Sequence, residues 1–219
     1  MKTREKRRLT AGLLLMASFI LWTILVQTVD VQAIGQNGTT VGFASLNRRF
    51  HQMTGVHMTL YHITDWLGLI PAIVCLCFGG LGLHQWICRK SLRKVDADLF
   101  LLGAYYVIVI AGYLVFEMVP VNYRPILIEG RMEASYPSST TLLVLSVMPT
   151  LSFQASRRLR LTWAKQAISV SARAFSLFMV IGRTVSGVHW ITDIAGAVLF
   201  SAGLFCIYQA VTLQLSNKK

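Results

Sequence analysis

The sequence has little acidic charge, few cysteines and few prolines for its length of 219 residues. It contains 9 Asp and Glu residues against 21 Lys and Arg, with 4 cysteines and 5 prolines. No repeat with a period of roughly 20 to 50 residues is visible, and no segment is of low complexity. The cysteines lie inside or at the ends of apolar runs, and Cys75-Leu76-Cys77 has neither the spacing nor the polar neighbours of a metal or redox site. We therefore interpret the cysteines as packing residues.

The excess of positive charge does not indicate a nucleic-acid partner. The net charge is +12, but the Lys and Arg residues form short clusters between apolar runs, without the interleaved aromatic side chains of a nucleic-acid platform. Such clusters are typical of the cytoplasmic loops of membrane proteins. The charge therefore indicates membrane topology.

Apolar residues are abundant and occur in long blocks. They make up 54% of the chain, and the mean hydropathy is +0.57. The first block, residues 9–29, follows a basic start, and its roughly 20 residues would span about 30 Å as a helix. That length exceeds a signal-peptide core, and Val31-Gln32-Ala33 is only a poor cleavage site. The chain is predicted to be an integral membrane protein.

The predicted fold class is all-α. We expect one integral-membrane domain over residues 1–219, with six transmembrane helices in a bundle at approximately residues 9–29, 63–87, 98–119, 138–153, 166–181 and 191–215. Pro71 is expected to kink the second span, and Gly79, Gly80 and Gly82 to permit close helix approach. Most of the 21 Lys and Arg residues then fall in cytoplasmic segments, including Lys218-Lys219, so both termini are predicted to be cytoplasmic. Span lengths favour a bacterial plasma membrane.

The segment Gly182 to Asp193 carries the most informative polar residues. If a helix begins near Val188, His189 and Asp193 share one face, where the carboxylate can accept a proton from one imidazole nitrogen. Arg183 lies six residues before His189, beyond a Ser-Gly turn signal, and could reach the same point. A snorkelling cation beside a satisfied polar pair is the structural alternative. Ionisable groups beside apolar spans are nevertheless candidates for function, because placing them there is costly.

Two further motifs lie on the same predicted extracytoplasmic face. They are Tyr123-Arg124-Pro125 and Pro137-Ser138-Ser139-Thr140. With the His189 segment they resemble the signature K-x6-R-P, P-S-G-H, S-R-x5-H-x3-D of the type 2 phosphatidic acid phosphatase and vanadium haloperoxidase superfamily. The third motif matches in both spacings, with Gly182 in place of the first Ser. The motifs cover about the last 110 residues.

The resemblance implies a phosphatase that forms a phosphohistidine. His189 would attack phosphorus, and Asp193 would hold its tautomer. The phosphate oxygens would be bound by the arginines and by the start of the fourth span, at Arg124, Arg183, Ser138, Ser139 and Thr140. No metal and no cofactor is implied, and the expected partners are membrane lipids and a lipid phosphate or diphosphate substrate at the outer face.

Two positions depart from the family pattern. Glu117 stands where the pattern has Lys, and Thr140 where it has the His that protonates the leaving group. His51, His57 or His62 could supply the acid, and Arg131 could replace the Lys, although each is also explained as an ordinary interfacial or loop residue. Without a general acid, a diphosphate is a better substrate than a monoester such as phosphatidic acid, because a phosphate ester leaves without much protonation.

Alternative functions stay open at this point. A lipid-phosphate binding or carrier protein would keep the arginines without turnover, whereas an intact His189 and Asp193 favour an enzyme. A vanadate-dependent peroxidase is disfavoured by Thr140. The remaining acidic residues near these motifs are interpreted as an interfacial anchor, Asp65, and as solvated loop charges, Glu129 and Glu133.

Overall fold

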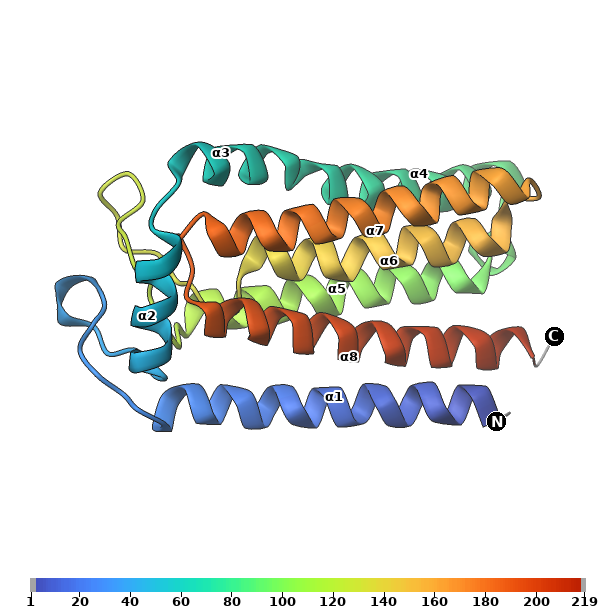
Figure 1. Ribbon diagram of the computed structural model, residues 1–219. Helices are drawn as coiled ribbons and strands as arrows, with labels where there is room; N and C mark the ends of the chain where they lie inside the picture. Colours follow the sequence, from blue (N-terminus) through green and yellow to red (C-terminus); the bar gives the residue numbers. More distant parts are fainter. Residues whose placement is uncertain (1–2, 218–219) are drawn as a thin grey trace.

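The computed structural model describes residues 3–217 as a bundle of long helices (Figure 1). The helices are α1 (Thr3–Thr28), α2 (Ala44–Thr54), α3 (Met58–Leu67), α4 (Leu69–Arg89), α5 (Ala97–Met118), α6 (Ser139–Arg158), α7 (Thr162–Val185) and α8 (Ile191–Ser216), with short 3-10 turns at Gln36–Gly38 and Leu92–Lys94. Residues 3–217 contain only isolated β-bridges besides these helices. The all-α prediction is confirmed. The basic residues Lys2, Lys218 and Lys219 lie outside the described part of the chain.

Five helical segments are long and apolar enough to cross a membrane. They are Thr3–Thr28, Met58–Arg89, Ala97–Met118, Thr162–Val185 and Ile191–Ser216, and each overlaps a predicted span. The predicted span 138–153 lies in α6, which is less apolar than these five because it carries several Ser and Thr residues and Gln154. Several of its polar side chains are buried in the protein, where Tyr106 hydrogen-bonds with Thr150 and Gln154 with Tyr208. The low hydropathy of α6 thus reflects contact with other helices.

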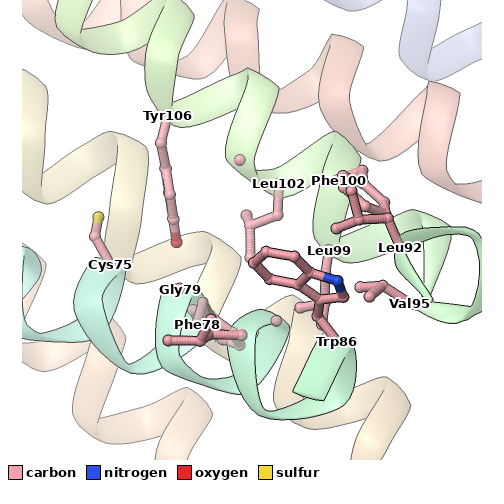
Figure 2. Close-up of a pocket in the computed structure, with 13 residues that line it drawn as sticks. Cys75, Phe78, Gly79, Trp86, Leu92, Val95, Leu99, Phe100, Leu102 and Tyr106 are labelled. Atoms are coloured by element: carbon pink, nitrogen blue, oxygen red, sulfur yellow. The ribbon is translucent and has the colours of Figure 1, made fainter. Parts of the chain in front are cut away.

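The second apolar segment breaks at a different residue from the one expected. α3 ends and α4 begins at Gly68, whereas Pro71 lies in the first turn of α4, where the missing N–H breaks no helical hydrogen bond. The expected close helix approach at Gly79, Gly80 and Gly82 is also wrong, since a Cβ at any of these glycines would meet no atom within 4 Å. Gly79 and Gly82 instead line an apolar cavity of about 350 Å³ between α4 and α5 (Figure 2).

Close packing occurs between α1 and α8, which run side by side (Figure 1). A Cβ at Gly12 would lie 2.7 Å from Ile207, and one at Gly203 would lie 2.9 Å from Met16. Only glycine permits this approach. The contact joins α1 to α8, the first and last helices of the described chain.

The loops that follow α1, α5 and α7 gather at one end of the bundle, opposite the end where the two termini lie (Figure 1). At this end α2 lies across the ends of α1 and α8. The buried side chain of Asn47 on α2 donates to Gly42 O at 2.8 Å and to Thr192 Oγ1 at 3.0 Å. In the loop after α5, Asn122 pairs with Ser135 and Arg124 pairs with Glu133 through backbone hydrogen bonds. Distant parts of the sequence thus meet beside the start of α8.

Candidate active site

His189 lies in the turn between α7 and α8. α8 begins at Ile191, where the predicted sixth span begins, and Trp190 is its N-cap residue, so His189 lies just before the helix rather than within its first turn. The side chain of Asp193 accepts the backbone N–H of Trp190 at 3.0 Å, and this capping interaction stabilises the start of the helix. Gly187 makes the preceding turn with φ +71°, and a Cβ there would lie 2.0 Å from Gly55 O. The turn that carries His189 is therefore packed against the loop between α2 and α3.

Both predicted arginines reach the imidazole of His189. Arg124 Nη1 and Arg183 Nη2 each lie 3.4 Å from His189 Nε2. A guanidinium only donates hydrogen bonds, so Nε2 accepts and carries no proton, which leaves its lone pair facing the two cations. Within residues 3–217, Nε and Nη1 of Arg183 make no hydrogen bond, and Nε of Arg124 has only an ion-pair contact with Glu133 at 3.0 Å. These buried donors around Nε2 are candidates for binding an anion.

The other nitrogen of His189 faces a serine. Nδ1 lies 3.0 Å from Ser135 Oγ and 3.2 Å from Ser135 O, and Ser135 Oγ donates to Asp193 Oδ2 at 2.6 Å. His189 Nδ1 and Asp193 Oδ2 are 4.0 Å apart, too far for a direct hydrogen bond. The expected direct hydrogen bond is replaced by a serine between the two groups. Asp193 is also held by Asn122, whose Nδ2 donates to Oδ1 at 3.1 Å.

The electrostatic environment keeps His189 neutral. Burial, together with the positive charges of Arg124 and Arg183, lowers the pKa of His189 well below its ordinary value. At neutral pH the imidazole is therefore unprotonated at Nε2 and bears its proton on Nδ1. This is the form required of a nucleophile at Nε2.

The predicted phosphate-binding residues at the start of the fourth span lie at the N-terminus of α6. Ser138 is the N-cap residue, and its backbone N–H donates to Asp193 O at 3.2 Å, which places the starts of α6 and α8 together. The Ser138 hydroxyl donates to Thr141 Oγ1 at 3.1 Å. Ser139 and Thr140 form the first turn of α6. Within residues 3–217, the side-chain hydrogen bonds of His189 are to Arg124, Arg183 and Ser135, and none is to Ser139 or Thr140. Their contribution to an anion site would come from the unpaired N–H groups of the first turn.

Two carboxylates lie beside the arginines. Glu133 Oε2 is 3.0 Å from Arg124 Nε, and Asp65 Oδ1 is 3.7 Å from Arg183 Nη1. Glu133 is therefore an ion-pair partner of Arg124 and not only a solvated loop charge. Asp65, which we interpreted together with Trp66 as an interfacial anchor, also faces Arg183. Both carboxylates are partly exposed, so they offset part of the positive charge of the buried arginines from the solvent-facing side of the site.

Three residues of the site escape prediction from the sequence. Ser135 and Asn122 hold Asp193, and the ring of Tyr61 lies beneath both guanidinium groups, with centroid distances of 4.9 Å to Arg183 and 5.9 Å to Arg124. Ser135 lies three residues before Ser138, and this proximity to a motif is the signal that could have identified it.

The suggested replacements for the missing Lys and His lie at the surface or against other groups. Arg131 and His62 are exposed, and His57 Nε2 bonds to Thr54 O at 2.8 Å. His51 packs against the ring of Trp190 at 5.6 Å, and burial lowers its pKa. Glu117 is exposed near the end of α5.

Comparison with known proteins identifies a structural relative. No protein-family model and no curated protein matches the sequence. The crystal structure of a transmembrane PAP2-type phosphatidylglycerolphosphate phosphatase from Bacillus subtilis superimposes with a TM-score of 0.60 at 17% sequence identity, covering 94% of this chain and 96% of that chain. With five apolar helices, this likeness supports an integral membrane protein. The resemblance drawn from the three motifs thus extends to the structure, and the chain has the fold of a transmembrane PAP2-type phosphatase.

Proposed function

We propose that this chain is a membrane phosphatase that hydrolyses a lipid phosphate or a polyprenyl diphosphate through a phosphohistidine on His189. One observation carries the proposal: Arg124 and Arg183 both place a guanidinium nitrogen 3.4 Å from His189 Nε2. A phosphoryl group beside Nε2 would be within reach of both cations. Planar cations suit the equatorial oxygens of a phosphoryl group in transfer.

The reaction proceeds in two displacements. Nε2 of His189 attacks phosphorus, and the leaving oxygen keeps the electron pair of the broken bond. The arginines and the N–H groups at the start of α6 stabilise the charge on the phosphoryl oxygens. Water then attacks phosphorus, and the electron pair of the N–P bond returns to Nε2.

The absence of a general acid at Thr140 decides the preferred substrate. General acid catalysis is worth about 10² to 10⁴ in rate when the leaving group is an alkoxide. A diphosphate releases a phosphate ester, which is a far better leaving group. The substrate in this proposal is therefore a polyprenyl diphosphate, and phosphatidic acid should be cleaved more slowly.

The orientation of the site is part of the proposal. α6 is proposed as a sixth crossing, enclosed by other helices, with both termini in the cytoplasm and the site at the outer face. The basic clusters after α4 and α6 support this orientation. A bacterial plasma membrane fits the span lengths.

Acid-labile capture of ³²P from a labelled diphosphate tests the function. The wild type should form an acid-labile phosphoenzyme, and His189→Ala should not. His57→Ala serves as the control, because it removes an exposed histidine whose imidazole hydrogen-bonds to Thr54 O. Lipid-phosphate binding without any phosphoenzyme in the wild type would contradict the enzyme and indicate a binding or carrier protein.

A further inference from the structure

We propose that Ser135 is a positioning residue, which transmits the charge of Asp193 to the nucleophile His189. The inference rests on the proposed function and extends it, because the resemblance assigns no role to this position. Ser135 is 1% exposed, and its hydroxyl lies 2.6 Å from Asp193 Oδ2 and 3.0 Å from His189 Nδ1. It is the side chain through which the two groups are connected.

The direction of the hydrogen bonds follows from the partners of each atom. Nε2 of His189 accepts from two arginines, so the proton of the neutral imidazole is on Nδ1. That proton lies between two acceptors of Ser135, the hydroxyl Oγ at 3.0 Å and the backbone carbonyl at 3.2 Å, and only the hydroxyl can pass a hydrogen bond on to Asp193. The serine proton is then donated to the carboxylate of Asp193. A hydroxyl can accept and donate at once, which makes serine suited to this place.

The carboxylate has no shorter route to the imidazole. Oδ1 accepts from Asn122, while Oδ2 accepts from the Trp190 N–H and from Ser135. Asp193 is 0% exposed, and its nearest oxygen is 4.0 Å from Nδ1. The capping bond to Trp190 holds the carboxylate at the helix start, so Ser135 fills the remaining distance.

The serine acts in both displacements without releasing a proton. When Nε2 forms the bond to phosphorus, the imidazole gains positive charge while its proton stays on Nδ1. The hydrogen bonds from Nδ1 to Ser135 and from Ser135 to Asp193 shorten and stabilise that charge. When water displaces the histidine, the electron pair returns to Nε2 and one water proton passes to solvent.

Ser135→Ala tests the inference, with Ser146→Ala as a matched control, because Ser146 is buried and its hydroxyl has no partner within the described residues. Losing a hydrogen bond to a charged group should slow phosphoenzyme formation about 10- to 100-fold. Ser135→Thr, which keeps the hydroxyl, should recover most of the rate. Orthovanadate binding should change little in either variant, which shows that the arginines are still in place.

A double variant separates this role from a purely structural one. If Ser135 acts through Asp193, then Ser135→Ala combined with Asp193→Asn should be no slower than Asp193→Asn alone. If the rate losses of the two single variants multiply in the double variant, or if Ser135→Ala reacts at the wild-type rate, the inference about Ser135 is overturned. The proposed phosphohistidine intermediate would be unaffected by either result.

A spectroscopic measurement decides the matter independently of turnover. In protein with ¹⁵N-labelled histidine, the Nδ1 proton resonance of His189 should move upfield in Ser135→Ala and stay unchanged in Ser146→Ala. An unchanged resonance in Ser135→Ala would refute the relay, even if the wild type forms no phosphoenzyme and the proposed function itself fails.

Discussion

The guanidinium of Arg183 lies over the ring of Tyr61, with 4.9 Å between its central carbon and the ring centroid. Arg183 is 1% exposed and reaches His189 with one terminal nitrogen and Asp65 with the other. Stacking on an aromatic ring favours a planar cation and holds it at a fixed distance from the ring. The position of this cation therefore depends on its shape as well as on its charge.

Arg183→Lys should lower the rate of phosphoryl transfer by about 10²- to 10³-fold, because the point charge of Lys cannot stack on Tyr61 and contact two phosphoryl oxygens. Steady-state kinetics on a diphosphate substrate measures the change. Arg173→Lys is the matched control, since Arg173 is an exposed arginine on the same helix. Equal rates in the two variants would show that Arg183 is only a counter-ion for Asp65.

Glu133→Gln should tighten the binding of phosphate or orthovanadate by about 2- to 5-fold, because the carboxylate competes for Arg124 at a partly exposed position. Equilibrium binding at low ionic strength measures this change. Glu129→Gln removes an exposed carboxylate from the same loop and should leave the affinity near that of the wild type. Weaker binding in Glu133→Gln would mean that Glu133 holds Arg124 in its binding position.

The stability of the protein should depend on pH through His189. Its pKa is lowered in the folded state, so below its unfolded pKa of about 6.5 the unfolded chain binds a proton that the folded chain excludes. Stability should therefore fall with decreasing pH, by up to about 1.4 kcal/mol per pH unit. His189→Gln should show a smaller decrease in unfolding temperature between pH 7 and pH 5. If the unfolding temperatures of the wild type and His189→Gln decrease equally between pH 7 and pH 5, the pH dependence of stability comes from another group.

Gly187→Ala should destabilise the fold by about 1 to 3 kcal/mol and reduce activity. Its φ of +71° is strained for any other residue, and the added Cβ would lie 2.0 Å from Gly55 O. Gly103→Ala is the control, because a Cβ there meets no atom within 4 Å. Chemical denaturation measures the stability difference, and a wild-type value for Gly187→Ala would show that the turn tolerates another conformation.

Much of the helical arrangement follows from local patterns in the sequence. Apolar runs between basic clusters located five membrane-crossing segments, and the start of α6 at Ser139 lies one residue from its predicted position. The break at Gly68 was misplaced because Pro71 is the stronger local signal for a kink, although a proline in the first turn disturbs nothing. Contact between Gly12 and the region of Gly203 could not be inferred, since no local pattern relates residues so far apart.

The site shows the same division between local and long-range information. The spacing of Arg183, His189 and Asp193 was readable, and Arg124 was identified by its motif. Ser135 carries no motif of its own, and its place between His189 and Asp193, which are 4.0 Å apart, depends on the capping contact that holds Asp193 at the start of α8. Tyr61 reads as one of several aromatic residues in an apolar run until the fold places it beneath both arginines.

The most direct test of the account is a structure of the protein with orthovanadate, which imitates a phosphoryl group in transfer. The account predicts vanadium bonded to Nε2 of His189, with oxygens within hydrogen-bond distance of both Arg124 and Arg183. Vanadate bound away from Nε2, or touching only one of the two arginines, would contradict the claim that these three side chains share one phosphoryl group.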